Sequence, residues 1–263
     1  MDLRVVTYET HERVAVVTLN RPDRLNAWTT RMEAEVGWCM RRADSDAEVR
    51  VIVITGAGRG FCAGADMDAL DRYAGGDTYE IAPVESDDTH GNFGGTFSYL
   101  LGLSTPVIAA INGPAAGVGF VLACFADLRF AAAGAKLTSS FARLALPAEH
   151  GVSWVLPRIV GSARAADLLL SSRVVLAEEA LTLGLVNRVW PSAHLLDETL
   201  AYARVLADEL APSSLAAIKR QLWASGSLAD AWQDANDRMT SMLQSAEFAE
   251  GVAAFRQKRP PKF

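Results

Sequence analysis

Two stretches of small residues each follow a buried-looking strand and lead into helix-like sequence. The first is GAGRGFCAGAD (56–66), after the apolar run VRVIVIT, and the second is NGPAAGVG (112–119), after TPVIAAI. Small residues let a ligand approach the backbone, and N–H groups at a helix start lack partners within the helix. Two such N–H groups converging on one point would form an oxyanion hole, which stabilises negative charge developing on a carbonyl oxygen.

The residues alone leave other uses of these turns open. Glycine-rich strand-to-helix turns are common as plain structure in α/β proteins. GRGFCA (58–63) also fits the relaxed G-x-G-x-x-A form of a dinucleotide site. Asp77 or Glu80 lies near the position of the acidic residue that binds the ribose in such a site, although the sequence around them predicts a loop. No Lys-Ser/Thr follows for a phosphate loop, and GVSWV (151–155) lacks the last glycine of a nucleophile elbow.

The elements that would position these turns can be read from the hydrophobic pattern. Residues 3–8 and 13–19 predict a hairpin with ETHE as its turn, and 49–55 predicts a buried strand. Helical patterns cover 29–46, 97–104 and 163–171. Residues 71–95, rich in Gly and Asp, predict a long surface loop.

Strands and helices alternate to about residue 190, and helical pattern then continues to about residue 256. The sequence therefore predicts an α/β fold with a core at 1–195 and a C-terminal helical region at 196–263. No apolar run reaches the length of a membrane span, and the first fourteen residues lack the apolar segment of a signal peptide.

The composition and the charge exclude several classes of protein. The chain has 263 residues, 50% hydrophobic and 21% charged, with a net charge of −6 and no basic stripe that would suggest nucleic acid as a partner. Its three cysteines, Cys39, Cys62 and Cys124, have no paired or metal-type spacing. We therefore expect free thiols, no metal site and a cytoplasmic location.

Five motifs in order carry a resemblance. They are LNRPDRLNA, GAGRGFCAGAD, INGPAAGVGFVLACFADLRFA, LPAEHGVSWVLPRIVG and EALTLGLVNRV. From about residue 3 to the C-terminus, the chain resembles the enoyl-CoA hydratase/isomerase (crotonase) superfamily. The resemblance implies a superhelix of ββα units with a C-terminal helical trimerisation region, assembled as a homotrimer or a dimer of trimers. It also implies acyl-CoA thioester substrates, a stabilised enolate and no cofactor beyond the coenzyme A of the substrate.

The resemblance also implies roles for particular residues. The two oxyanion N–H groups fall on Ala65 and on Val118, a position often occupied by glycine in the family. An aromatic residue and a lysine near the C-terminus, Phe255 and Lys258, would reach a coenzyme A, either that of their own subunit or that of a neighbouring one. The remaining substrate and coenzyme A contacts would come from Arg24, Leu25, Ala27, Ala63, Gly64, Asp66, Met67, Gly117, Phe141 and Trp154.

The acid–base residues depart from the hydratase pattern. The two glutamates that activate water in hydratases of this superfamily fall on Val121 and Phe141, which cannot transfer a proton. Glu149 aligns with the acidic position of several isomerases and some hydrolases. A single carboxylate can take a proton from one carbon and return it to another, which is a double-bond shift. The neighbouring Leu146, Val152 and Trp154 would raise its pKa.

We therefore expect Glu149 to be the lone acid/base of an isomerase-like enzyme. Water addition to 2-enoyl-CoA is the first alternative, and hydrolysis of a thioester or of a β-diketone is the second. A catalytically silent acyl-CoA-binding protein is the third. His150 could carry a second proton or orient Glu149, or it could point away.

Overall fold

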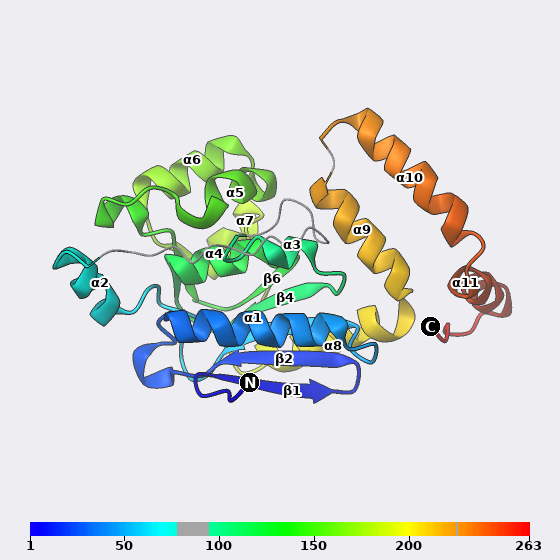
Figure 1. Ribbon diagram of the computed structural model, residues 1–263, viewed down its shortest axis with the longest axis horizontal. Coiled ribbons are helices and arrows are strands. Elements are labelled where there is room, and N and C mark those ends of the chain that lie inside the picture. The colour runs from blue at the N-terminus through cyan, green and yellow to red at the C-terminus, as the bar shows by residue number, and fades with distance from the viewer. Residues whose placement is uncertain (78–94, 225) are drawn as a thin grey trace.

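A six-stranded sheet in the order β1-β2-β3-β4-β6-β9 lies at the centre of the computed structural model, which describes residues 1–77, 95–224 and 226–263 (Figure 1). Only β1 and β2 pair antiparallel, and the other neighbours are parallel. The strands are β1 (Val6–His11), β2 (Val14–Leu19), β3 (Val51–Gly56), β4 (Val107–Ile111), β6 (Leu128–Ala132) and β9 (Arg188–Trp190). The α/β class predicted from the sequence is confirmed.

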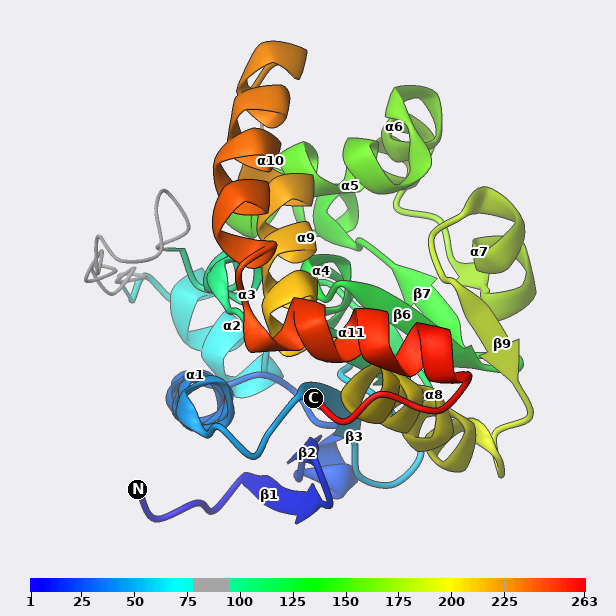
Figure 2. The ribbon, with the colours of Figure 1, turned by 90° about the vertical axis from the view of Figure 1, so that its right-hand side faces the viewer.

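Helices cover both faces of this sheet, which is why β3 and β4 are buried at every residue. Helix α1 (Thr30–Ser45) packs on β1 and β2, and α8 (Leu195–Glu209) packs on β2, β3, β4, β6 and β9. Figure 2 shows the two helices on opposite sides of the first strands. The Thr29 side chain caps α1 by accepting a hydrogen bond from the Met32 N–H.

The hairpin turn differs from the expected one. ETHE was predicted as the turn, but β1 continues through His11, whose partner in β2 is Val14. The connection is therefore the two residues Glu12 and Arg13. Glu12 adopts a left-handed conformation with φ 55°, which the tight turn requires. The turn contains no glycine, the residue that usually indicates such a conformation in a sequence.

A smaller sheet of β5 (Ala115–Ala116), β7 (Lys136–Thr138) and β8 (Val175–Leu176) stands beside the first. Helices α2 (Met67–Ala74), α3 (Tyr99–Gly102), α4 (Val118–Phe125), α5 (Val152–Val160), α6 (Ser162–Ser171) and α7 (Ala177–Leu183) fill the connections. The predicted loop at 71–95 begins later than expected because α2 continues to Ala74, and residues 78–94 lie outside the described ones. The helix predicted over 97–104 is confirmed only at its centre, α3.

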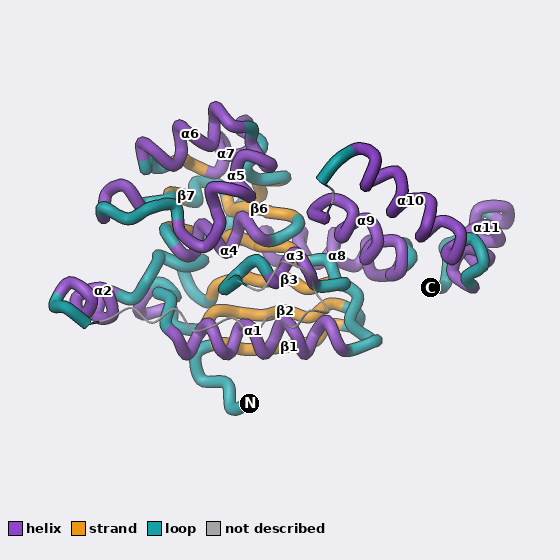
Figure 3. Tube along the Cα trace, turned by 45° about the horizontal axis from the view of Figure 1, so that its top comes forward, coloured by secondary structure: helices purple, strands orange, loops and turns teal. Residues whose placement is uncertain are grey.

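The C-terminal helical region consists of α8, α9 (Pro212–Ala224), α10 (Leu228–Met242) and α11 (Ala246–Gln257). Figures 1 and 3 show α10 and α11 set apart from the strands, whereas α8 lies against them. Helix α9 is held by Lys219, which is 4% exposed and whose Nζ lies 2.8 Å from the Asp127 carboxylate and 3.0 Å from the Thr105 carbonyl. The same Asp127 oxygen accepts the Val107 N–H at the start of β4.

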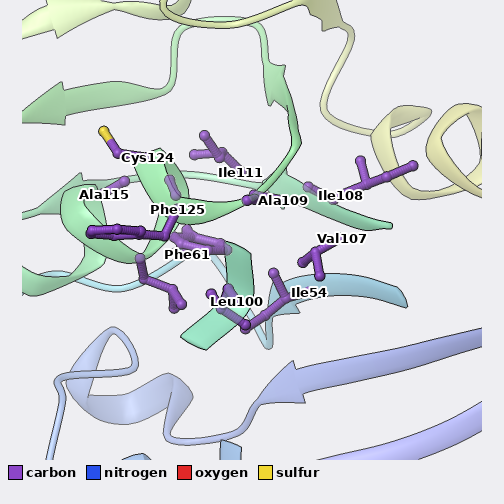
Figure 4. Packing of buried hydrophobic residues seen from close by; sticks show 14 of the residues in the cluster. Ile54, Phe61, Leu100, Val107, Ile108, Ala109, Ile111, Ala115, Cys124 and Phe125 are labelled. Carbon is purple, nitrogen blue, oxygen red and sulfur yellow. The ribbon is translucent and has the colours of Figure 1, made fainter. Parts of the chain in front are cut away.

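The hydrophobic core joins the sheet to the helices of the glycine turns. Figure 4 shows Phe61, from the first turn, among side chains of β4 and α4 that include Ile111 and Phe125. All three cysteines are free, as expected from their spacing, and the structure shows that all three are buried. Among the described helices, none is both long and apolar enough to cross a membrane.

Candidate active site

The two glycine turns lie side by side. Cys62 and Ala115 form an isolated parallel bridge, in which the Cys62 N–H donates to the Pro114 carbonyl and the Ala116 N–H donates to the Cys62 carbonyl. A methyl group placed on Gly117 would lie 3.8 Å from the Gly64 Cα atom. Burial raises the pKa of the Cys62 thiol to about 12, so this cysteine serves the contact as a small apolar side chain.

Glycine is required where the turns meet. Gly64 has φ +111° and Gly117 has φ +49°, backbone conformations that L side chains rarely adopt. After these residues come Ala65 and Val118, the latter being the first residue of α4. Within the described part of the chain, neither the Ala65 N–H nor the Val118 N–H donates a hydrogen bond. The structure thus brings two adjacent turns together, each with a free backbone donor.

The loop before α1 is fastened to the first turn. The buried Asn26 accepts the Arg21 N–H and donates to the carbonyls of Ala57 and Gly60. The Ala63 N–H donates to the Leu25 carbonyl at 3.0 Å. Leu25 and Ala27 are half-buried on this loop and Arg24 is exposed, and the hydrogen bond places the segment 24–27 next to the segment 63–67.

Both carboxylate oxygens of Asp66 are bonded to other groups of the protein. Its Oδ2 atom lies 2.7 Å from Arg21 Nη1, and its other oxygen accepts the Asp68 N–H. Burial alone would raise the pKa of Asp66, but these hydrogen bonds and the Arg21 charge hold that pKa below its usual range. Arg21 and Asn26 were not singled out from the sequence, because their partners lie far along the chain. Met67, next in sequence, is exposed.

Glu149 begins the short 3-10 helix η4 (Glu149–Gly151), directly before α5. It is half-buried, and burial raises the pKa of its carboxyl group. Across the described residues, no side chain or backbone group donates a hydrogen bond to this carboxylate or pairs with it. A desolvated carboxylate without a partner is suited to accepting and donating a proton.

The two hydratase positions are apolar in the structure. Val121 is fully buried in α4, and Phe141, the first residue of the 3-10 helix η3 (Phe141–Leu144), is 4% exposed. Trp154 is half-exposed on α5, where the Arg158 guanidinium lies 3.6 Å from its ring centroid and the Trp223 ring of α9 lies 6.1 Å away. Trp154 therefore touches the C-terminal helical region.

Phe255 and Lys258 lie far from the turns of their own chain. Phe255 lies in the last turn of α11 and Lys258 is its C-cap, and Figure 1 shows α11 at the opposite end of the molecule from α2, which follows the first turn. Phe255 is 88% exposed. Within one chain, the structure does not bring these residues to the other predicted contacts.

A cavity of about 360 Å³ lies between α3, α9 and α10, and none of the site residues selected from the sequence lines it. Its walls include Leu101, Ala217 and Arg238. No cluster of three or more potential metal ligands is found in the described ranges.

Comparisons with known proteins agree with the fold and the motif order. Residues 9–263 match the family model of Enoyl-CoA hydratase/isomerase. A 1,2-epoxyphenylacetyl-CoA isomerase of Escherichia coli K12 is 37% identical over 253 residues, covering 95% of this chain and 94% of that protein. A probable enoyl-CoA hydratase of Rhodobacter capsulatus is 38% identical over 266 residues, covering 100% and 99%. The crystal structure of a probable enoyl-CoA hydratase/isomerase from Mycobacterium abscessus superposes with a TM-score of 0.86 at 34% identity, covering 98% of each chain.

Proposed function

This chain is an enzyme of the enoyl-CoA hydratase/isomerase family, and on that premise we propose that it shifts a carbon–carbon double bond in an acyl-CoA thioester. The observation that carries the proposal is the unpaired, half-buried carboxylate of Glu149. Glu149 has no partner among the described residues, while Val121 and Phe141 occupy the two positions that would hold glutamates in a hydratase.

The reaction can be balanced with these groups alone. The Glu149 carboxylate removes a proton from the carbon next to the thioester carbonyl of a 3-enoyl-CoA. The electron pair moves onto the thioester oxygen, and the N–H groups of Ala65 and Val118 stabilise the resulting enolate. Glu149 then returns the proton to the far carbon of the original double bond, which gives the 2-enoyl-CoA and restores the carboxylate.

The coenzyme A moiety would lie along the joined surface of the loop at 24–27 and the turn at 63–67. In this arrangement Arg24, Leu25, Ala27, Ala63 and Met67 contact the ligand. Asp66, held by Arg21, fixes the shape of the turn. The acyl chain would extend toward Phe141 and Trp154.

Self-association would complete this site. The described part of α10 and α11 exposes Leu228, Trp232, Met239, Leu243, Phe248 and Phe255. An apolar surface of this kind favours burial against another subunit. We propose a homotrimer or a dimer of trimers, in which Phe255 and Lys258 of one subunit contact the coenzyme A of the next.

Hydration of 2-enoyl-CoA is the second candidate, because the relative from Rhodobacter capsulatus is named as a hydratase. In that reaction Glu149 alone would activate a water molecule. Two assays on purified protein separate the candidates: conversion of 3-enoyl-CoA to 2-enoyl-CoA, and hydration of 2-enoyl-CoA, each with short and long acyl chains. Both are run on wild type and on Glu149→Ala.

We expect isomerisation that is lost in Glu149→Ala, little hydration, and equal binding of a non-reactive acyl-CoA by the two proteins. Hydration that depends on Glu149 would replace the proposal with the second candidate. Release of free coenzyme A would indicate a hydrolase. Binding without turnover in either assay would indicate an acyl-CoA-binding protein.

A further inference from the structure

Three aromatic rings form a continuous stack beside the candidate site. The Phe97 ring centroid lies 5.2 Å from that of Trp28 at an interplanar angle of 61°, and 5.2 Å from that of His150 at 79°. Both contacts are edge-to-face, an arrangement in which the ring positions are mutually defined. Phe97 is 1% exposed, so the surrounding side chains hold this middle ring in place.

The first end of the stack is bonded to the oxyanion turn. The Trp28 N–H donates to the Gly64 carbonyl at 2.8 Å, and the Asp66 N–H donates to the Trp28 carbonyl at 2.9 Å. These two hydrogen bonds lie on either side of Ala65, which pairs with Trp28 as an isolated bridge. The position of the Trp28 backbone therefore fixes the position of the Ala65 N–H.

The other end of the stack is the residue after Glu149. His150 has φ 52°, a left-handed conformation that costs a non-glycine residue free energy and persists only where surrounding contacts hold it. At His150 the contact is the Phe97 ring, and the next residue, Gly151, is the N-cap of α5 with φ 80°. Because His150 follows Glu149 directly, its ring contact with Phe97 limits how far the backbone beside Glu149 can move.

We propose that Phe97 is a positioning residue, which sets the separation between the Glu149 carboxylate and the Ala65 N–H through its ring contacts with His150 and Trp28. The inference rests on the proposed function, in which both groups act on one substrate. A displacement of catalytic groups by about 1 Å can lower the rate on the order of a hundredfold while leaving ground-state binding intact.

The chain offers a matched control for this role. Phe130 of β6 is also 1% exposed and is also flanked by two rings, Trp190 at 4.9 Å and Tyr202 at 5.2 Å, both at 80°. It lies in the sheet between β4 and β9, and its two flanking rings, Trp190 and Tyr202, belong to neither glycine turn nor to η4. Phe97→Leu and Phe130→Leu therefore remove equivalent packing, and only the first alters the site.

The experiment compares kcat, KM and Tm of the full-length enzyme and these two variants in the acyl-CoA reaction that wild type catalyses. We expect both variants to lower Tm by similar amounts. Phe97→Leu should lower kcat by about ten- to a hundredfold with KM within about threefold, and Phe130→Leu should leave both near wild type. Equal kcat values in the two variants, or a loss confined to KM, would overturn the inference.

A second pair of variants separates packing from proton transfer at His150. His150→Phe keeps a ring against Phe97 but has no titratable group, and His150→Ala removes the ring, while both variants still have to adopt the left-handed backbone of this position. We expect His150→Phe to retain kcat within about threefold and His150→Ala to lose about tenfold. A phenylalanine variant as inactive as the alanine variant, or less active than it, would assign His150 a chemical role and overturn the role of the ring contacts.

Glu149→Ala is assayed in parallel, so the two proposals can fail separately. If Glu149→Ala is inactive and Phe97→Leu has the kcat of the control, only the positioning role is wrong. If Glu149→Ala keeps full activity, or if wild type turns over neither 3-enoyl-CoA nor 2-enoyl-CoA, the proposed function is wrong and the positioning role is rejected with it.

Discussion

Asp66 and Glu149 are two carboxylates from the loops of the candidate site, and the protein treats them in opposite ways. Burial disfavours the charged form of both. Asp66 is compensated by Arg21 and by the Asp68 N–H, so its pKa is lowered, whereas Glu149 has no such partner in the described residues and its pKa is raised. The paired carboxylate of Asp66 stabilises a turn, whereas a desolvated, unpaired carboxylate such as Glu149 is suited to proton transfer. Four predictions test this division.

The largest expected effect is on turnover. Glu149→Gln keeps the shape of the side chain and removes its ability to exchange a proton, so kcat should fall by about 10²- to 10⁴-fold. The free energy of unfolding at neutral pH should stay equal or rise, since an unpaired, desolvated charge is removed. Steady-state kinetics and urea denaturation measure the two quantities. A glutamine variant with wild-type kcat would show that proton transfer does not occur at this residue.

Asp66→Asn should show the reverse pattern. It leaves the Arg21 guanidinium, whose side chain is 22% exposed, without its carboxylate. Removing one partner of a largely buried ion pair costs about 3 kcal/mol of unfolding free energy. Urea denaturation should register that loss, together with a smaller decrease in kcat than Glu149→Gln causes. If Asp66→Asn is as stable as wild type, the structural role assigned to Asp66 is wrong.

Removing both partners sharpens the second prediction. Arg21→Met together with Asp66→Leu leaves no uncompensated charge, so the double variant should be more stable than Asp66→Asn by about 1–3 kcal/mol. The single Arg21→Met variant serves as the control, because it leaves Asp66 unpaired. A double variant that is less stable than Asp66→Asn and only as stable as Arg21→Met would mean that the hydrogen bond from Arg21 to the Ala27 carbonyl matters more than the charges.

The smallest effects concern pH, and their signs differ. The raised pKa of Glu149 means that its ionisation penalises folding. That penalty is absent below the ordinary glutamate pKa of about 4.3 and is complete above the raised folded value, so Glu149→Gln should gain stability relative to wild type as pH rises through this window.

For Asp66 the sign is opposite. Despite burial, Arg21 and the Asp68 N–H lower its pKa, so its stabilisation is complete above the ordinary aspartate pKa of about 3.9 and is lost as pH falls through the folded value. The deficit of Asp66→Asn should therefore shrink in acid. Each unit of pKa shift corresponds to about 1.4 kcal/mol. Thermal denaturation from pH 3 to pH 8 would reveal parallel curves if the two carboxylates were equivalent.

Much of the fold was predictable because it depends on local pattern. The buried runs that became β3 and β4, and the glycines before α2 and α4, specify strand, turn and helix without reference to distant residues. The hairpin turn was placed wrongly because Glu12 adopts a left-handed conformation that its residue type does not signal. Helix ends in the C-terminal region were equally hidden within a continuous helical pattern.

The site was predictable where a motif carries it and hidden where partners are distant. The turns that contain Ala65 and Val118 were found from their glycines. The ion pair between Arg21 and Asp66 joins residues 45 positions apart, and the ring stack joins Trp28, Phe97 and His150 from three separate segments. Such contacts arise only when the chain folds, so neither residue spacing nor composition indicates them.

Lys219 sets a limit on how far the chain can be shortened. Its ammonium group fixes α9 to Asp127, which in turn holds the first N–H of β4. A truncation after residue 226 removes α10 and α11 but keeps this buried pair. A truncation before residue 219 leaves the Asp127 charge beside β4 without its cation, at a cost of several kcal/mol. The stop codon that separates a shortened folded protein from an unfolded one should therefore fall between these two positions.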